Sequence, residues 1–323
     1  MSLTTVVSCP GMNMLANHGF IARDGITNFA EAVDACQNVF NMHWDLAAVI
    51  TLIATVLGDG DTITQRFSIG CDATSRTAAL DLNLLTGSQP GLNGHGNFEV
   101  DGSISRDDYF ISEGDVFTLN GTLFAQMVET TGGKFTKSGI SKVKYNRWHD
   151  SQKRNDQFFY GPIGLISYAA SAFLPELYGD GESASTETIA TFFGVHQDES
   201  GAWIYGHNES IPAEWYNRKE PYGLVKVVEN LLSMYLENPV LFGGNTADGH
   251  FDAIDFGAIK DGKLSLDLSV NGALCLIYQL LAWPIPSPAN GILNIGKDAV
   301  ALITSVLGDT IAELGCSAPL NAS

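Results

Sequence analysis

Residues Ser8–Phe20 read SCPGMNMLANHGF and place a cysteine at the start of an expected helix. Proline follows Cys9, and its fixed φ suits the first position of a helix. The backbone amides of residues 11–13 then point back toward the sulfur, together with the positive end of the helix dipole. These groups lower the pKa of a thiol and favour the thiolate, the form that binds metal. Such a thiolate suits an axial haem ligand, although a cysteine–proline pair alone is more typical of a buried structural cysteine.

The residues on both sides of Cys9 carry a family resemblance. The pattern Ser8–Asn13, then Leu15–Phe20, then Arg23–Gly25 closely resembles the proximal-cysteine segment of the fungal haem-thiolate peroxidases. That family contains the unspecific peroxygenases and chloroperoxidase. It usually has Pro-Cys-Pro, and Ser8 replaces the first proline here. The resemblance implies a haem b whose iron is bound by Cys9.

A second motif follows at Phe98–Arg106, FEVDGSISR. A carboxylate, a carbonyl and a hydroxyl within five residues can converge on a small hard cation, although acidic Gly-Ser turns often merely cap helices. The segment resembles the metal signature of the same family. The resemblance implies that Glu99, the Val100 carbonyl and Ser103 bind Mg²⁺ or Mn²⁺ beside a haem propionate. Val100 stands where the family usually has Gly or His, which removes any histidine chemistry but keeps the backbone ligand.

The segment Ser167–Phe173, SYAASAF, lacks an expected acid. The resemblance places Ala170 where the family has a distal glutamate that moves the peroxide proton. Ile163 matches the arginine that assists this glutamate in larger members. Acid–base catalysis of this kind accelerates a reaction about 10²–10⁴-fold. Its loss therefore raises the activation free energy of the reaction with peroxide by roughly 3–5 kcal/mol.

Other residues could replace this acid, or the register could be in error. Glu176 lies beyond Pro175 and would face elsewhere on a continuing helix. His43 precedes an apolar helix and is a second stand-in, although a capping role also suits it. His18 is interpreted as structural, and Ser167 could position a water but has too high a pKa for a general base.

Helix faces and the resemblance together predict a distal cavity with mostly aliphatic walls. Some of its expected residues could equally be ordinary core. Aliphatic walls favour a bulky apolar substrate. The expected lining residues are Met42, Leu46, Val49, Phe98, Leu165, Ile166, Ala170 and Phe173.

The charge of the chain limits its partners. Among 323 residues, 36 acids face 17 bases, giving a net charge of −19. This balance argues against nucleic acid and anionic membranes, and the longest apolar run, Leu46–Leu57, is too short to span a bilayer. Seven bases fall between Lys134 and Arg154. They form either a substrate-steering patch or, as we favour, a solvated helix face.

Cysteines and sequons bear on localisation. Of the five cysteines, Cys36 is interpreted as a packed thiol on a helix face. The resemblance matches Cys275 and Cys316 to a C-terminal disulfide of larger peroxygenases, which implies an oxidising compartment. Asn120, Asn208 and Asn321 begin glycosylation sequons. No signal peptide precedes Cys9, so the chain either starts at the mature protein or is intracellular; we expect a secreted glycoprotein.

Apolar periodicity predicts a mainly α protein. We expect one compact helical domain over residues 1–323, with about eight to ten helices enclosing a haem. The periodicity fades over residues 71–90, which predicts an irregular connection there. Gly-rich charged turns are expected from Pro175 to about Gly201. The expected helices are Asn28–Phe40, Leu46–Leu57, Val116–Thr130, Ser138–Asp156, Ile163–Phe173 and Leu224–Leu236.

Three functions remain open. The first is a haem-thiolate peroxygenase or peroxidase that oxidises an apolar organic substrate with hydrogen peroxide, as a monomer or small homo-oligomer. The second is a haem-thiolate lyase, isomerase or dehydratase of secondary metabolism that uses no peroxide. The third is a non-enzymatic carrier or vestigial domain, against which the retained Cys9 and metal motif argue.

Overall fold

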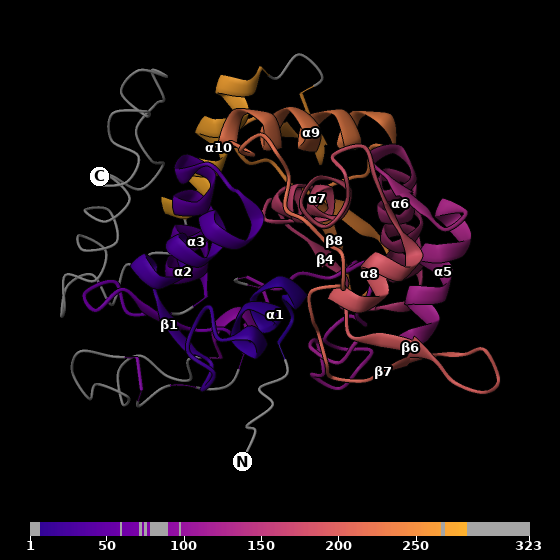
Figure 1. Ribbon diagram of the computed structural model, residues 1–323. Helices are drawn as coiled ribbons and strands as arrows, with labels where there is room; N and C mark the ends of the chain where they lie inside the picture. The colour runs from indigo at the N-terminus through magenta and orange to yellow at the C-terminus, as the bar shows by residue number, and fades with distance from the viewer. Residues whose placement is uncertain are drawn as a thin grey trace.

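The expected mainly α fold is confirmed. The computed structural model describes residues 7–58, 60–70, 73, 76–77, 90–96, 98–265 and 269–282. Most regular structure in this part of the chain is helical (Figure 1). The α-helices are α1 (Pro10–His18), α2 (Phe29–Phe40), α3 (Trp44–Leu57), α5 (Gly121–Thr131), α6 (Lys137–Arg154), α7 (Gly164–Phe173), α8 (Thr186–Phe192), α9 (Leu224–Glu237) and α10 (Val270–Ala282).

The strands are short and pair antiparallel in small ladders. β1 with β2, β3 with β5, β6 with β7, and β10 with β11 make two-stranded pairs, and β4, β8 and β9 make a three-stranded sheet. The ladders pair segments that lie between the helices. The strands are β1 (Ile26–Asn28), β2 (Arg66–Ser68), β3 (Lys134–Thr136), β4 (Phe159–Tyr160), β5 (Ser183–Ser185), β6 (Val195–Gln197), β7 (Trp203–Tyr205), β8 (Gly243–Asn245), β9 (Phe251–Ala253), β10 (Ile259–Lys260) and β11 (Lys263–Leu264).

Polar side chains decide where several helices begin. Asn28, Asn120, Thr136 and Ser185 each accept a hydrogen bond from an amide in the first turn of the helix that follows. These bonds satisfy amides that have no partner within the helix. Asn120 therefore starts α5 at Gly121, and the expected start at Val116 is wrong.

Two expectations after α7 are also wrong. Pro175 does not end the helix: residues Leu174–Tyr178 (η2) continue it as one π-helical turn. Such turns accommodate a residue that breaks the α-helical hydrogen-bond pattern. The following Gly-rich stretch is not only turns, because Ser185 caps the helix α8 and β5 and β6 flank it.

Helix α7 lies in the middle of the fold. It packs against α9, α6 and η2. Figure 1 shows α7 end-on near the centre, with α2 and α3 on one side, α5 and α6 on the other, and α9 across the top. Residues on α7 can therefore face a cavity inside the molecule.

The last described helix, α10, packs against α9 and α3. Cys275 on α10 is disulfide-bonded; its expected partner, Cys316, lies outside the described residues, as do most of residues 71–90 and Asn321. None of the described helices is long and apolar enough to span a bilayer.

Candidate active site

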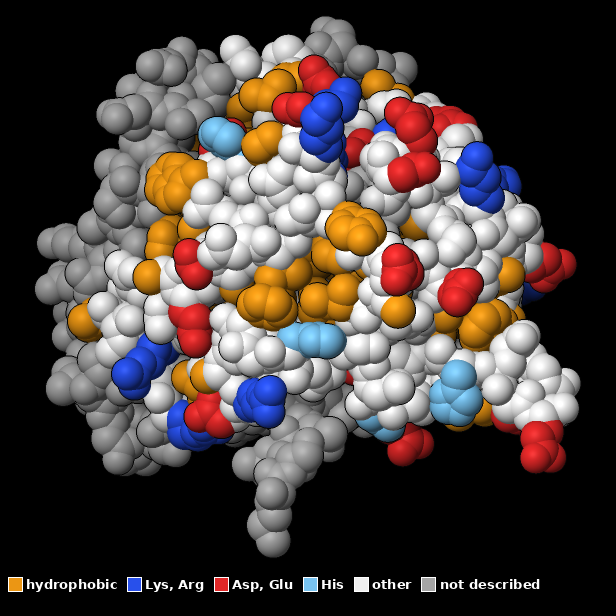
Figure 2. All heavy atoms as spheres, viewed as in Figure 1, with side chains coloured by type: hydrophobic (Ala, Val, Ile, Leu, Met, Phe, Trp, Pro, Cys, Tyr) orange, Lys and Arg blue, Asp and Glu red, His pale blue; other side chains and the backbone are white. Residues whose placement is uncertain are grey.

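A cavity of about 290 Å³ lies between the start of α1 and one face of α7. Its walls also include residues of α2, α3, the 98–106 segment and one side chain of α6. Most of the exposed lining is apolar. Apolar side chains also gather near the centre of the face shown in Figure 2, in the area between α1 and α7, while acidic side chains are scattered around them.

Cys9 is the residue immediately before α1 and lines the cavity, as expected of a cysteine at a helix start. The expected lowering of its pKa is wrong in this structure. Burial raises the pKa of the Cys9 thiol above its ordinary value. The amide of Met12, the charge of Arg106 and the amide of Gly11 lower this pKa by less. The helix N-terminus and Arg106 nevertheless supply the positive environment that a thiolate ligand needs.

Glu99, Val100 and Ser103 line the same cavity. The Glu99 carboxylate is buried, and its Oε2 lies 2.7 Å from His95 Nδ1. Glu99 Oε1 is buried and has no hydrogen-bond partner among the described residues. Burial raises the pKa of Glu99, and the hydrogen bond with His95 lowers it by less. An unsatisfied buried carboxylate oxygen fits a bound cation.

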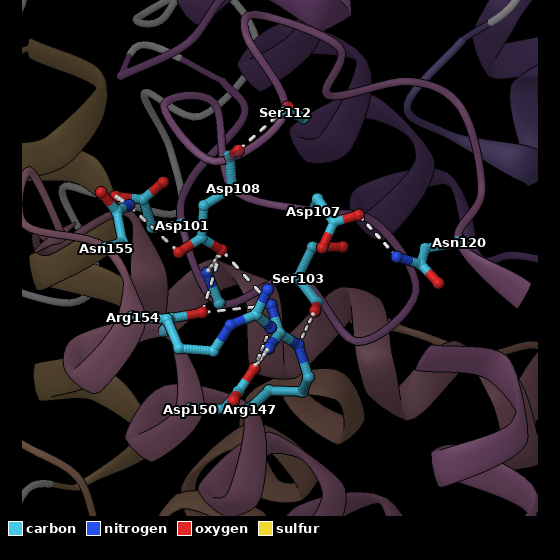
Figure 3. Close-up of polar contacts among 12 residues, drawn as sticks. Asp101, Ser103, Asp107, Asp108, Ser112, Asn120, Arg147, Asp150, Arg154 and Asn155 are labelled. Atoms are coloured by element: carbon cyan, nitrogen blue, oxygen red, sulfur yellow. Dashed lines mark hydrogen bonds and ion pairs between the residues drawn. The ribbon is translucent and has the colours of Figure 1, made fainter. Parts of the chain in front are cut away.

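The 98–106 segment is anchored to α6 by a buried polar network (Figure 3). Arg147 donates from Nε to the Ser103 carbonyl at 2.8 Å and from Nη2 to Asp108 Oδ1 at 3.3 Å. Asn155 donates to Asp101 and Asp108 at 3.2 and 3.1 Å. Burial and the neighbouring Asp108 raise the pKa of Asp101 to about 7. The network holds the backbone of the expected metal loop in place. In the described part of the chain no group of three His, Cys, Asp or Glu could hold a metal by itself, so a cation would need ligands beyond the carboxylate of Glu99.

The cavity brings together only part of the expected lining. Met42, Phe98, Ile166, Ala170 and Phe173 line it. Three other expected residues are buried and are not among the residues that line it: Leu46, Val49 and Leu165.

The part of α3 that reaches the cavity is its middle, where Ile50, Thr51, Ile53 and Ala54 line the cavity, and Leu46 and Val49 come before this stretch. On α7, Leu165 shares its face with the buried residues 168 and 172. Residues 163, 166, 167, 169, 170, 171 and 173 line the cavity.

The expected catalytic positions are divided in the same way. Ala170 is exposed and lines the cavity, and Ile163 lines it at the start of α7. His43 is not among the lining residues: it precedes α3, its side chain is 59% exposed, and its Nδ1 lies 2.9 Å from Asp45. Glu176 is occupied by ion pairs with Lys137 and Arg218. Neither His43 nor Glu176 is therefore placed to supply the acid that the sequence resemblance leads us to expect at position 170.

Sequence reasoning missed Lys144. This side chain on α6 is 3% exposed and lines the cavity. Its Nζ donates to Ser167 Oγ at 2.7 Å and to the Gly102 carbonyl at 3.4 Å. Burial, and then the charge of Arg147, lower the pKa of Lys144 to about 7, while Asp108 raises it.

The expected solvated helix face is therefore wrong for Lys144 and Arg147, which are both buried. A signal was present in the sequence. Ile140, Lys144 and Trp148 follow one another at intervals of four residues, which places the lysine on the apolar face of α6.

Comparison with known proteins identifies the family. Residues 7–220 match the model of "Peroxidase, family 2". This chain is a member of peroxidase family 2. An aromatic peroxidase, fscJ, of Fusarium equiseti is 31% identical over 96% of this chain and 75% of its own length. The dothistromin biosynthesis peroxidase dotB of Dothistroma septosporum is 28% identical over 95% of this chain and 77% of its own length. An aromatic peroxygenase of Coprinellus radians is 32% identical over 60% of this chain and 77% of its own length.

The resemblance to fungal haem-thiolate peroxidases is thus confirmed at the level of the family. These relatives indicate that this family 2 peroxidase is an oxidoreductase that uses peroxide, and the family indicates a haem cofactor.

Proposed function

We propose that this family 2 peroxidase is a haem-thiolate peroxygenase that transfers oxygen from hydrogen peroxide to an apolar organic substrate. One observation carries the proposal: Cys9 and the segment of Glu99, Val100 and Ser103, about 90 residues apart in the chain, line one apolar cavity. The first is a suitable axial ligand and the second a suitable cation site.

The cavity residues fit a haem in their chemistry. Cys9 would bind the iron, and the unsatisfied Oε1 of Glu99, with the Val100 carbonyl and Ser103, would hold Mg²⁺ or Mn²⁺. A bound haem supplies the iron that activates peroxide and the electrons that cleave its O–O bond. The residues of this chain orient that group and shape the substrate space around it.

Arg106 supports the same assignment. It is buried, lines the cavity and donates to the carbonyls of Val7 and Phe117 and to Ser105 Oγ. None of these hydrogen-bond partners is charged, and the guanidinium interacts electrostatically with both Glu209 and Cys9, so its positive charge can help to stabilise an anion at the cavity. The Cys9 thiolate and the haem carboxylates are such anions.

Much of the cavity wall is apolar. Phe98, Ile166, Phe173 and Met42 are among its lining residues. These walls favour an apolar organic substrate through burial of its surface, as the names of the aromatic peroxidase and peroxygenase relatives also suggest.

Compartment and assembly complete the proposal. Cys275 is disulfide-bonded, and we propose that its partner is Cys316. A disulfide favours an oxidising compartment and is consistent with a secreted protein. We propose a single domain over residues 1–323, acting as a monomer or small homo-oligomer.

Substitution of the axial ligand tests the proposal. The parent is expected to bind haem, to show the CO-reduced Soret band of a thiolate haem, and to transfer oxygen from H₂¹⁸O₂ to an aromatic hydrocarbon. Cys9→Ser should lose that band and the transfer, because a serine hydroxyl stays protonated. Cys36→Ser, which changes another cysteine on the cavity wall, is the matched control and should keep both. A parent that binds haem without incorporating ¹⁸O into any substrate would refute the peroxygenase.

Ala170 favours one alternative function, a haem-thiolate lyase, isomerase or dehydratase. Because no carboxylate stands at this position on the cavity wall, such an enzyme would react slowly with peroxide and would be protected from stray oxidation. Substrate turnover that continues in the presence of catalase would favour it, and strict dependence on peroxide would exclude it.

A further inference from the structure

The cavity contains few groups that can carry a proton. The ionisable side chains on its described wall are Cys9, Cys36, Glu99, Arg106, Lys144 and Tyr178. Each of these can be examined for its ability to gain and lose a proton near neutral pH.

Five of the six are unsuited to this task. Cys9 and Glu99 are assigned to the iron and the cation. Arg106 keeps its charge at all ordinary pH values. Burial, with a smaller effect of Cys9, raises the pKa of Cys36 to about 12, and burial raises the pKa of Tyr178 far above its ordinary value. Lys144 remains.

Hydrogen bonds to the described residues leave one position on the Lys144 nitrogen open. The Ser167 hydroxyl donates to the Gly164 carbonyl at 2.6 Å, so its oxygen accepts from Lys144 Nζ at 2.7 Å. A second hydrogen points to the Gly102 carbonyl at 3.4 Å. A neutral amine has two hydrogens and one lone pair, whereas an ammonium has three hydrogens. The third position is therefore where a proton can arrive and leave.

The surroundings of Lys144 set its charge. Burial and Arg147 disfavour the ammonium, and Asp108 favours it. The rings of Tyr160 and Tyr168 lie 5.5 and 5.3 Å from Nζ and also favour a cation. Burial, then Arg147, opposed by Asp108, place the pKa of Lys144 at about 7, where an amine can act both as a base and as an acid.

Ser167 places this amine beside the missing carboxylate. Ser167 and Ala170 are one turn apart on α7, and both line the cavity. A peroxide in the space in front of Ala170 would thus lie on the side of the cavity where Nζ is held.

We propose that Lys144, held in place by Ser167, is the proton-transfer group of this cavity and takes the role of the carboxylate absent at Ala170. The inference rests on the proposed function of the same site. The neutral amine takes a proton from one oxygen of hydrogen peroxide and returns it to the other. A bound haem would supply the two electrons that cleave the O–O bond and would keep the other oxygen atom for transfer to the substrate. Lys144 delivers its proton to the leaving oxygen, which departs as water, and so returns to the neutral amine.

Three variants of the haem-loaded enzyme test this role. Lys144→Met removes the amine and keeps an unbranched side chain. Lys144→Arg keeps a positive charge that does not release its proton. Lys142→Met changes an exposed lysine of the same helix and is the matched control. For each, haem content, the CO-reduced Soret band and the stopped-flow rate with peroxide from pH 5 to 9 are recorded.

The parent rate should rise with pH through about 7, because only the neutral amine accepts a proton. Lys144→Met and Lys144→Arg should react roughly 10²-fold more slowly and lose this pH step, with haem content unchanged. Lys142→Met should match the parent.

Cyanide provides a readout that requires no turnover. Hydrogen cyanide must lose its proton to bind as the anion, so its association rate should fall about tenfold or more in both Lys144 variants. The inference is overturned if Lys144→Met matches the parent in both rates. It is also overturned if Lys144→Met loses haem while Lys144→Arg restores haem and activity, which would identify Lys144 as an anchor for a haem carboxylate.

The two proposals fail in different ways. If the parent binds a thiolate haem but ignores peroxide, the proposed function fails, and cyanide association still decides the role of Lys144. A parent that lacks the thiolate-haem spectrum overturns both.

Discussion

Individual residues on α7 determine what the cavity can do with a proton. Ala170 is exposed to the cavity, so a longer side chain at this position has room to extend. Its neighbour one turn earlier, Ser167, already accepts a hydrogen bond from Lys144. A carboxylate introduced at position 170 would therefore enter the same space as the lysine amine.

We predict that Ala170→Glu restores the peroxide reaction of Lys144→Met by at least about tenfold. A carboxylate is ionised above pH about 4–5, so the double variant should remain fast at pH 5, where the parent is slow. Stopped-flow rates across pH measure both effects. Ala170→Gln in the same background is the matched control, because an amide of the same size transfers no proton. Equal rates for the Glu and Gln variants would contradict the prediction.

The limits of sequence reasoning are clear at single positions. The positions of Cys9 and of the Glu99–Ser103 segment on one cavity followed from short motifs. Lys144 was missed because the strongly basic stretch around it suggested a solvated face, although its spacing from Ile140 and Trp148 is that of a buried position. The thiol pKa was misjudged because the local helix dipole was considered without the burial that opposes it.

Among the secondary-structure elements, the π-helical turn η2 is joined to three other parts of the chain through one side chain. Its Glu176 carboxylate accepts from Lys137 at the start of α6 at 2.9 Å, from Arg218 at 2.7 Å and from Asn230 on α9 at 2.8 Å. Burial raises the pKa of Glu176, but the hydrogen bonds of Lys137 and Arg218 together lower it below its ordinary value. The ionised form is thus favoured in the folded protein.

We predict that Glu176→Gln lowers the free energy of unfolding by about 3–5 kcal/mol, because it leaves two cations without their buried partner. The folded pKa is lowered, so the ionised group stabilises the protein above its unfolded pKa and this contribution is lost as pH falls through the folded value. Denaturant unfolding should therefore show a large difference at pH 7 that shrinks below pH 4. Glu182→Gln, at an exposed position in the following turn, should have little effect. An equal loss in both variants would contradict this role.

Comparison of the expected and observed helix boundaries shows which local sequence patterns predict them. Apolar periodicity alone found α2, α3 and α9 nearly to the residue. It failed for the start of α5, where the Asn120 cap decides the boundary, and for α8, a short helix hidden in a Gly-rich charged segment. The continuation through Pro175 places Glu176 in ion pairs with Lys137 and Arg218, tertiary contacts that no local pattern contains.

For the whole molecule, the disulfide of Cys275 constrains the C-terminal part of the fold. Cys275 lies on α10, which packs against α9 and α3. With the expected partner Cys316, the closed loop would be about 40 residues, and its cross-link would stabilise the protein by roughly 3–4 kcal/mol.

We predict that reduction with dithiothreitol lowers the free energy of unfolding by this amount and that Cys275→Ser has the same effect. Urea unfolding with and without reductant measures both. The matched control is reductant added to Cys275→Ser, which should change nothing further. A parent whose stability is indifferent to reductant would show that the cross-link contributes little.

The sulfur atoms on the cavity wall have a consequence for the working life of the protein. Met12, Met42 and Cys36 all line the space in which peroxide would be activated. Thioethers and thiols are oxidised in steps, and the later products are not readily reversed. Oxidant that meets no substrate will therefore react with these sulfur atoms. Each oxidation makes the apolar cavity wall more polar. The number of turnovers without substrate, rather than elapsed time, then sets the lifetime of this peroxidase. A substrate that binds well protects the enzyme because it reacts with the oxidant before the wall does.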